Sequence, residues 1–274
     1  MIIRIGIYNL GIYNKEKIRI REARMRNIKV TIAYDGTNYF GFQEQRGTRY
    51  QTIQGVLEDR LSRLAKKKIR VIGAGRTDSG VHARGQVINF DPGDWTIPAE
   101  RVAYALNSLL PEDIVALESE EVPLSFHARF SALAKSYRYT IYNGKLKDPF
   151  LRLYSYHIPF PLDVEAMQEG AVYLTGKHDF SAFRALGTPI KSTVRTLYEA
   201  SVTRQGDLIY IDLRGDGFLY HMARMIAGTL IRVGKGRIPP QEVADILESR
   251  DSLRGGPTAP ARGLCLERVE YGEC

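Results

Sequence analysis

The order in which strand and helix patterns follow one another constrains the fold of this chain more than any other feature of its sequence. Alternating apolar residues predict strands, and apolar residues three and four apart predict helices. Up to residue 121 the predicted order is strand, helix, strand, strand, helix, strand, over residues 27–34, 52–66, 69–73, 86–90, 98–110 and 113–121. Thr52 is placed to cap the first helix. This order is typical of a ferredoxin-like α+β unit with a mainly antiparallel sheet.

The second part of the chain repeats this order with longer connections. After two strand patterns, Asp163 is placed to cap a helix, and a hairpin, two further helices and a last strand follow. These patterns cover residues 136–142, 153–158, 163–174, 194–203, 208–213, 218–233, a short stretch after Pro240, and 264–271. We therefore predict an α+β protein of two similar halves that meet at a central cleft, with domains over residues 25–123 and 124–274.

Residues 1–24 differ from the rest of the chain, and we expect them to be an extension upstream of the folded protein. A regular strand pattern begins only after Met25. Residues 1–26 contain seven Lys or Arg and two Glu, so they carry +5 of the net charge of +8. Because so little net charge remains elsewhere, bulk charge alone does not indicate a polyanionic partner.

The composition excludes several classes of protein. No apolar stretch approaches the roughly 18 residues that span a bilayer, and no signal peptide follows the first methionine. The two cysteines, Cys265 and Cys274, are too few for a disulfide framework and wrongly spaced for zinc. These features predict a cytoplasmic protein that does not bind a membrane.

The segment 73–83, Gly-Ala-Gly-Arg-Thr-Asp-Ser-Gly-Val-His-Ala, is the most unusual connection between predicted strands. Its glycines allow the backbone to approach a ligand closely, with Arg76 and Asp78 between them. It is not a dinucleotide-binding fingerprint, because Asp78 stands where the third glycine belongs and a strand follows where a helix is required. The alternative interpretation is an ordinary glycine-rich turn with an Arg–Asp pair on the surface.

Six motifs, this segment among them, occur in one order along residues 27–271. They cover residues 33–43, 75–83, 105–114, 126–139, 178–183 and 217–228. In content and order they resemble the signature of the TruA-type tRNA pseudouridine synthases. The resemblance implies the pseudouridine synthase fold, with two ferredoxin-like halves around the active-site cleft. The extension at residues 1–24 is the one departure from the family's pattern.

The resemblance implies an isomerase that converts uridine to pseudouridine in the anticodon stem-loop of tRNA, at positions 38, 39 and 40. It also implies a homodimer that binds RNA across both subunits. The reaction breaks a glycosidic bond and rejoins the same base through C5, without redox change or an outside atom. The chain shows no P-loop, metal-ligand cluster, flavin motif or nicotinamide motif, so we expect no cofactor and no metal.

By position in the motifs, Asp78 is the nucleophile, Arg224 its cationic partner and Tyr137 the active-site tyrosine. A carboxylate attacks carbon or stabilises an oxocarbenium ion, and in a partly dry cleft it needs a cation beside it. A phenol stacks on uracil and relays the proton lost from C5. The residues alone leave open that Arg224 is an exposed helix arginine and that Tyr137 packs a core. They also leave open whether Asp78 attacks the sugar or the base, or a glycal forms.

A uridine stacked in a stem is out of reach, so we expect the enzyme to extrude it into the cleft. Arg76 is placed to fill the vacated stack or hold a phosphate, and His82 is placed to orient the loop. The motifs give these candidate substrate contacts: Tyr137, Arg76, His82, Arg129, His221 and Leu219. Further candidate contacts to the RNA backbone, with solvated surface charge as the alternative, are Arg84, Lys135 and Arg138. We expect Arg224 to share a helix side with Tyr220 and His221.

Two other classes of function compete with a tRNA isomerase. A non-catalytic RNA-binding module also suits duplicated ferredoxin-like halves, but it does not require the Asp78 segment, and no RNP-type aromatic consensus occurs. A small-molecule enzyme that binds a nucleotide through the glycines is disfavoured by the broken fingerprint. Release of tritium from C5 of uridine in tRNA distinguishes the three, because only isomerisation removes that hydrogen.

Overall fold

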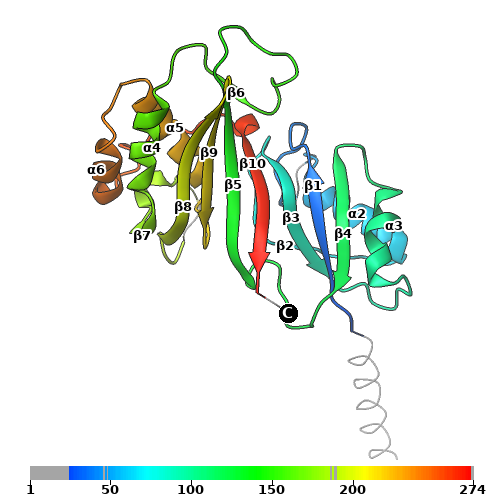
Figure 1. Ribbon diagram of the computed structural model, residues 1–274. Helices are drawn as coiled ribbons and strands as arrows, with labels where there is room; N and C mark the ends of the chain where they lie inside the picture. The colour runs from blue at the N-terminus through cyan, green and yellow to red at the C-terminus, as the bar shows by residue number, and fades with distance from the viewer. Residues whose placement is uncertain (1–24, 46, 48, 186, 188–189, 273–274) are drawn as a thin grey trace, which may run out of the picture.

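The computed structural model describes residues 25–45, 47, 49–185, 187 and 190–272, so the predicted extension lies outside the described residues. The described strands form one sheet in the order β4-β1-β3-β10-β5-β9-β8-β7, with β2 paired to β3 and β6 to β5 (Figure 1). The strands are β1 (Ile28–Tyr34), β2 (Ile72–Gly73), β3 (His82–Phe90), β4 (Ile114–Glu121), β5 (Ala132–Tyr142), β6 (Tyr156–His157), β7 (Gly176–Asp179), β8 (Val194–Gln205), β9 (Leu208–Gly215) and β10 (Leu264–Tyr271).

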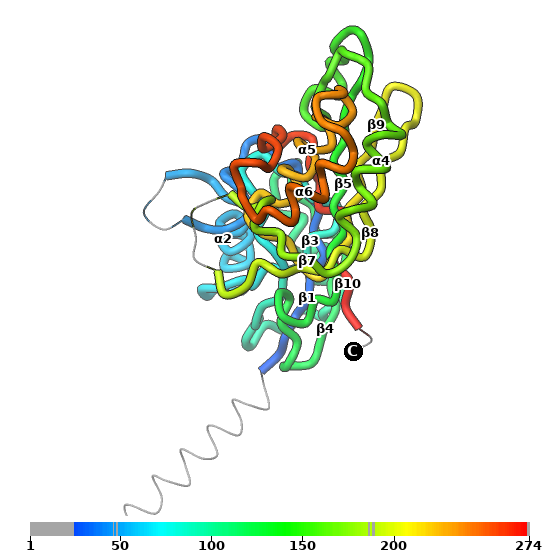
Figure 2. The backbone as a smooth tube through the Cα atoms, turned by 90° about the vertical axis from the view of Figure 1, so that its left-hand side faces the viewer, coloured from blue at the N-terminus to red at the C-terminus, as the bar shows by residue number. Residues whose placement is uncertain are grey.

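The helices of both halves pack against this sheet. They are α2 (Ile53–Ala65), α3 (Val102–Asn107), α4 (Val164–Val172), α5 (Met222–Gly234) and α6 (Glu242–Ser249), with 3₁₀ turns η1 (Ala99–Arg101), η2 (Ser181–Phe183) and η3 (Ala261–Gly263). Figure 2 shows α2, α5 and α6 on the same side of β5, β8 and β10. No helix in the part of the chain that the structure describes is long and apolar enough to cross a membrane.

The two halves share one topology, which confirms the predicted α+β class. In the N-terminal half, β1, α2, β2, β3, α3 and β4 give the spatial order β4-β1-β3-β2, with antiparallel pairs throughout. In the C-terminal half, β5, α4, β8, β9, α5 and β10 give the matching order β10-β5-β9-β8, again antiparallel. The boundary that we predict at residue 123 falls in the connection between β4 and β5.

A parallel pair between β3 and β10 joins the halves into one sheet, with Cys265 opposite His82 and Leu266 opposite Ala83. Strand β10 therefore lies between β3 and β5 in the middle of the sheet, as Figure 1 shows. The pair forms at the first residues of β3, directly after the glycine-rich segment. The junction thus brings that segment beside the strands of the C-terminal half.

One apolar core runs under both halves, because alternate residues of the strands face the helices. Strands β1 and β9 alternate between buried and half-buried residues along their whole length. A smaller cluster lies on the opposite face of β3, where residues 122–128 cover the sheet: Ala74, Val87, Val122, Phe126 and Ala128. Strand β3 is therefore buried on both faces, with Ile88 in the main core and Val87 in the small cluster.

Several local predictions hold. The side chain of Thr52 accepts a hydrogen bond from the backbone N–H of Gly55 and caps α2, at 3.2 Å. The carboxylate of Asp163 caps α4 in the same way, at 2.9 Å from the N–H of Ala166. The last strand has the predicted bounds.

Other elements differ from their predicted extent because distant groups take their hydrogen bonds. The strand predicted at 69–73 is limited to Ile72–Gly73, since the α2 side chains of Gln54 and Glu58 bond the backbone of Val71. The helix predicted at 98–110 becomes a 3₁₀ turn followed by α3, which ends where the Asn107 side chain pairs with the backbone of Ala116.

Two further strands differ from their predicted bounds, and one strand was not predicted. The strand predicted at 153–158 is only β6, because residues 151–155 form turns. The strand predicted at 86–90 begins earlier, at His82, because β10 pairs with its start. Strand β7, an additional edge strand that pairs with β8, was not predicted.

Candidate active site

A cavity of about 1260 Å³ opens between the two halves beside the β3–β10 junction. We call residues 74–81 the Asp78 loop; most of its residues line one wall of this cleft. The opposite wall is formed by β5 and by residues 218–224, where α5 begins. Residues from both halves therefore meet in the cleft, as the sequence predicts.

Asp78 and Arg224 form an ion pair in this cleft, although 146 residues separate them in the sequence. Nη1 of Arg224 donates to Oδ2 of Asp78 at 2.8 Å, and both side chains are largely buried. A second nitrogen, Nε of Arg224, donates to the carbonyl oxygen of Ala259 at 2.8 Å. The guanidinium is thus held from two sides, which excludes the alternative that Arg224 is an exposed helix arginine.

His221 approaches the same carboxylate oxygen. Its Nε2 lies 3.4 Å from Oδ2 of Asp78, and its backbone has a φ of +62°, in the left-handed region. A residue in that conformation cannot continue a helix, so α5 begins at Met222 and not at residue 218 as predicted. Tyr220 and His221 therefore precede the helix that carries Arg224. Burial lowers the pKa of His221, which favours a neutral imidazole at neutral pH.

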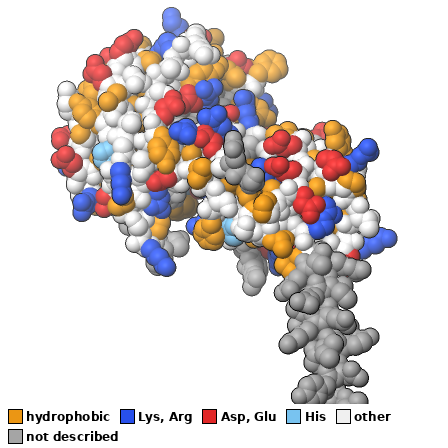
Figure 3. Space-filling view, turned by 60° about the horizontal axis from the view of Figure 1, so that its bottom comes forward, with side chains coloured by type: hydrophobic (Ala, Val, Ile, Leu, Met, Phe, Trp, Pro, Cys, Tyr) orange, Lys and Arg blue, Asp and Glu red, His pale blue; other side chains and the backbone are white. Residues whose placement is uncertain are grey.

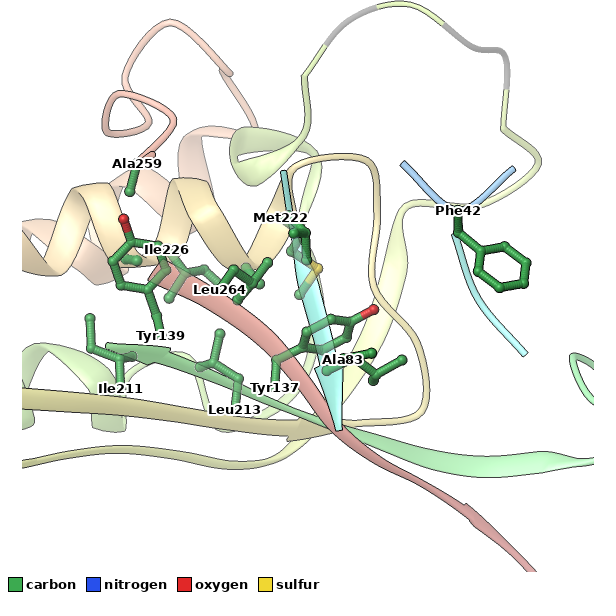
Figure 4. Packing of buried hydrophobic residues seen from close by; sticks show 14 of the residues in the cluster. Phe42, Ala83, Tyr137, Tyr139, Ile211, Leu213, Met222, Ile226, Ala259 and Leu264 are labelled. Carbon is green, nitrogen blue, oxygen red and sulfur yellow. The ribbon is translucent and has the colours of Figure 1, made fainter. Parts of the chain in front are cut away.

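Tyr137 and Tyr139 rise from the same face of β5, as alternation predicts (Figure 4). The ring of Tyr137 lines the cleft and meets the edge of Phe218, with ring centroids 4.8 Å apart. Among the described residues the Tyr137 hydroxyl has no hydrogen-bond partner, whereas that of Tyr139 donates to Pro260 O at 2.9 Å. Both rings belong to the buried core, as the alternative interpretation has it, and Tyr137 in addition lines the cleft. Burial raises the pKa of Tyr137 well above its ordinary value, so its phenol is protonated at neutral pH.

The segment 34–42 positions the Asp78 loop, which gives the motif at 33–43 a physical reason. The N–H of Phe42 donates to Thr77 O at 3.1 Å, and the N–H of Gly80 to Tyr39 O at 3.3 Å. Gly41 has a φ of +82°, and a Cβ atom there would stand 2.7 Å from Thr77 O. Only glycine therefore allows the two loops to pack this closely.

His82 supports the Asp78 loop from behind and does not line the cleft. Its Nδ1 accepts from the N–H of Gly36 at 3.2 Å and lies 3.1 Å from Oδ1 of Asp35. Its Nε2 lies 3.0 Å from the carbonyl oxygen of Leu153. This placement fits the predicted role in orienting the loop, whereas the predicted contact of His82 with substrate has no support from the cleft lining.

The other predicted contacts divide into two groups. Arg76, Arg129, Leu219 and Lys135 line the cleft. Arg84 and Arg138 do not: Arg138 pairs with Asp212 through two nitrogens, at 2.7 and 2.9 Å, and Arg84 lies 4.0 Å from Glu267. For these two arginines the structure favours the surface-charge alternative. On the face shown in Figure 3, acidic and basic side chains are intermingled.

Among the apolar side chains of the cleft that were not singled out from the sequence are Phe42, Phe218 and Leu264. Phe42 and Phe218 belong to the motifs at 33–43 and 217–228, so their motif membership was an available signal. Leu264 carries no local signal, because it reaches the cleft only through the insertion of β10 beside β3. Together they add apolar surface to the lining of the cleft. In the described residues no group of three His, Cys, Asp or Glu is arranged to hold a metal ion.

The chain is similar to known proteins over most of its length. A family model described as tRNA pseudouridine synthase matches residues 30–131 and 171–272. A tRNA pseudouridine synthase A of Moorella thermoacetica is 52% identical over 244 residues, which cover 89% of this chain and 99% of that protein. The protein of the same name from Acetivibrio thermocellus is 49% identical over 247 residues, covering 90% of this chain and 100% of that protein.

Proposed function

This chain belongs to the tRNA pseudouridine synthase family, and on that premise we propose that Asp78 is the nucleophile with which it isomerises uridine to pseudouridine in tRNA. One observation carries the proposal. Oδ2 of Asp78 is held by Arg224 and approached by His221, whereas Oδ1 has no hydrogen-bond partner among the described residues. The carboxylate is thus fixed through one oxygen and has the other available for a substrate in the cleft.

Each side chain has a role that follows from its surroundings. The Arg224 guanidinium compensates the charge of Asp78 while the bond between C1′ and N1 breaks and the base turns to present C5. Overall, one proton leaves C5 and one binds N1, so no oxidant, reductant or outside group is consumed. Tyr137 stacks beside the uracil, and its protonated hydroxyl relays the proton that leaves C5. Attack on the sugar, attack on the base and the glycal route all use the free oxygen of Asp78.

We further propose that the substrate site is the anticodon stem-loop, at positions 38, 39 and 40, and that the enzyme acts in the cytoplasm as a homodimer. The family resemblance supports these assignments. The target base must leave its stack to reach Asp78, and Arg76, exposed at the cleft edge, is placed to fill the gap. Sedimentation equilibrium of the purified chain tests the dimer, and a purely monomeric protein at micromolar concentration contradicts it.

The role of Asp78 is tested by release of tritium from tRNA that carries C5-tritiated uridine. We expect Asp78→Asn to lower the rate by about a thousandfold or more while RNA affinity stays within a fewfold. Asp212→Asn, which changes a carboxylate paired with Arg138 outside the cleft, is the matched control and retains turnover. Turnover by Asp78→Asn near the wild-type rate overturns the assignment. Wild-type protein that binds tRNA without tritium release supports the non-catalytic alternative.

A further inference from the structure

The cleft is lined by more cations than the chemistry at Asp78 uses. Its lining contains two carboxylates, Glu44 and Asp78, and six cationic side chains: Arg76, Arg129, Lys135, Arg184, Arg195 and Arg224. Both carboxylates are already engaged, Glu44 with Arg70 at 2.6 Å and Asp78 with Arg224. Neither pairs with the three cations that stand at the junction of β5, β8 and residues 127–130, namely Arg129, Lys135 and Arg195.

Lys135 is the centre of this group, and its side chain is half-buried. Its ammonium donates to the carbonyl oxygen of Ala74 at 2.7 Å, and it lies 3.2 Å from the position that a Cβ atom of Gly75 would take. Burial, together with the charges of Arg129 and Arg195, lowers the pKa of Lys135 to about 8. A half-buried ammonium with one neutral acceptor and two cationic neighbours is destabilised relative to one in water, and an anion bound beside it offsets that cost.

Arg129 and Arg195 flank Lys135 from different segments. Arg129 is exposed, with its guanidinium 5.6 Å from the ring centre of Phe130. Arg195 is anchored through Nη1 to the carbonyl oxygens of Ser192 and Val194, at 3.0 and 2.6 Å. Its Nε and Nη2 have no hydrogen-bond partner among the described residues. Donors from three segments therefore converge without an acceptor of opposite charge.

We propose that Arg129, Lys135 and Arg195 form a phosphate subsite that holds a backbone phosphate of the RNA next to the extruded nucleotide. Lys135 and Tyr137 are two residues apart on one strand and therefore face the same side, with their Cα atoms about 7 Å apart. Both line the cleft, so a nucleotide whose base lies on Tyr137 has its backbone close to Lys135. Because Lys135 also bonds Ala74, four residues before Asp78, a bound phosphate bears on the loop that carries the nucleophile. This inference rests on the proposed function, since it takes the target base to lie on Tyr137.

The test uses a stem-loop RNA with one target uridine, in which single phosphates around that uridine are replaced in turn by uncharged methylphosphonates. We expect one replacement to weaken binding to wild-type protein roughly tenfold and to lower the slope of log affinity on log salt by about 0.7. We expect Lys135→Met to bind unmodified RNA about as weakly as wild-type protein binds that one methylphosphonate RNA, and to bind the methylphosphonate RNA no more weakly still. At every other phosphate, we expect the loss of affinity from Lys135→Met and the loss from the methylphosphonate to multiply.

Two further variants distinguish loss of the phosphate subsite from a folding defect in Lys135→Met. Arg129→Gln changes an exposed side chain and is expected to show the same lack of additivity at the same phosphate. Arg138→Met, on the same strand but paired with Asp212 outside the cleft, is expected to bind all RNAs as wild type does.

Losses that multiply at every phosphate overturn the subsite, and they would leave Lys135 as a brace for Ala74 alone. The proposed function fails separately, through wild-type protein that binds the stem-loop but releases no tritium. The phosphate subsite is tested by binding affinity alone, so its test remains valid even if the wild-type protein releases no tritium.

Discussion

Tyr137 and Tyr139 show how two identical residues on one strand face acquire different roles. The hydroxyl of Tyr139 is bonded within the protein, whereas that of Tyr137 has no hydrogen-bond partner among the described residues. The sequence predicts that both face one side, but the difference between them arises from Pro260, which is 121 residues from Tyr139. No local pattern contains that information.

This difference predicts opposite outcomes for two matched variants. Tyr137→Phe removes a hydroxyl without an internal partner, so we expect slower tritium release with unchanged stability. Tyr139→Phe removes the donor to Pro260 O, so we expect a loss of about 1 kcal/mol in the free energy of unfolding with turnover nearly retained. Urea unfolding and single-turnover kinetics measure the two effects. Unaltered turnover by Tyr137→Phe removes the hydroxyl from the mechanism.

Lys135 predicts a pH dependence of stability. Its pKa is about 8 in the folded protein against an ordinary value of 10.5, so between these values the unfolded chain binds more protons. The contribution of Lys135 to the free energy of unfolding therefore rises with pH, by about 2 kcal/mol between pH 7.5 and 9.5. Tyrosine and cysteine titrations contribute equally to wild type and Lys135→Met. The difference between the two proteins in urea unfolding isolates the lysine, and identical pH profiles contradict its burial as a cation.

At the scale of the elements, the sequence predicts existence and order better than bounds. Elements whose ends depend on local caps, such as α2 at Thr52, were predicted well. Elements whose ends depend on distant groups were not: Val71 leaves its predicted strand because side chains of α2 satisfy its backbone. The start of α5 was misplaced because the left-handed backbone of His221 is not encoded by helical periodicity. The motif at 217–228 contains the residues that line the cleft, but Tyr220 and His221 lie before helix α5 and not within it.

Helix α5 also depends on a close contact that holds Arg224 in place. A Cβ atom on Gly228 would stand 1.8 Å from the carbonyl oxygen of Pro257, and residues of that same connection bond Arg224 through Ala259. We expect Gly228→Ala to lower the free energy of unfolding by about 3 kcal/mol or more and to reduce turnover.

The matched control for this prediction is Gly55→Ala in α2. There a Cβ atom would meet only the side chain of Thr52, at 3.1 Å, and we expect a change within about 1 kcal/mol. Urea unfolding of both variants gives the comparison. Equal stabilities would show that the connection at Pro257 moves aside without cost.

At the scale of the whole molecule, every residue assigned to the site lies within residues 25–272. The relatives are matched over 99–100% of their own length by 89–90% of this chain. We therefore expect a variant that begins at Met25 to retain wild-type turnover at saturating tRNA, with weaker RNA binding at low salt because basic residues are lost. Tritium release and a salt series measure both. A large fall in turnover at saturation would assign the extension a part in catalysis.

The placement of β10 in the middle of the sheet has a consequence for how the enzyme is made. A ribosome delivers the strands in chain order, and residues 264–271 follow all the others. Until they emerge from the exit tunnel, β3 and β5 have no strand between them and the two walls of the cleft remain unjoined. We therefore expect the two walls of the cleft to come together only after β10 has been synthesised and has inserted between β3 and β5.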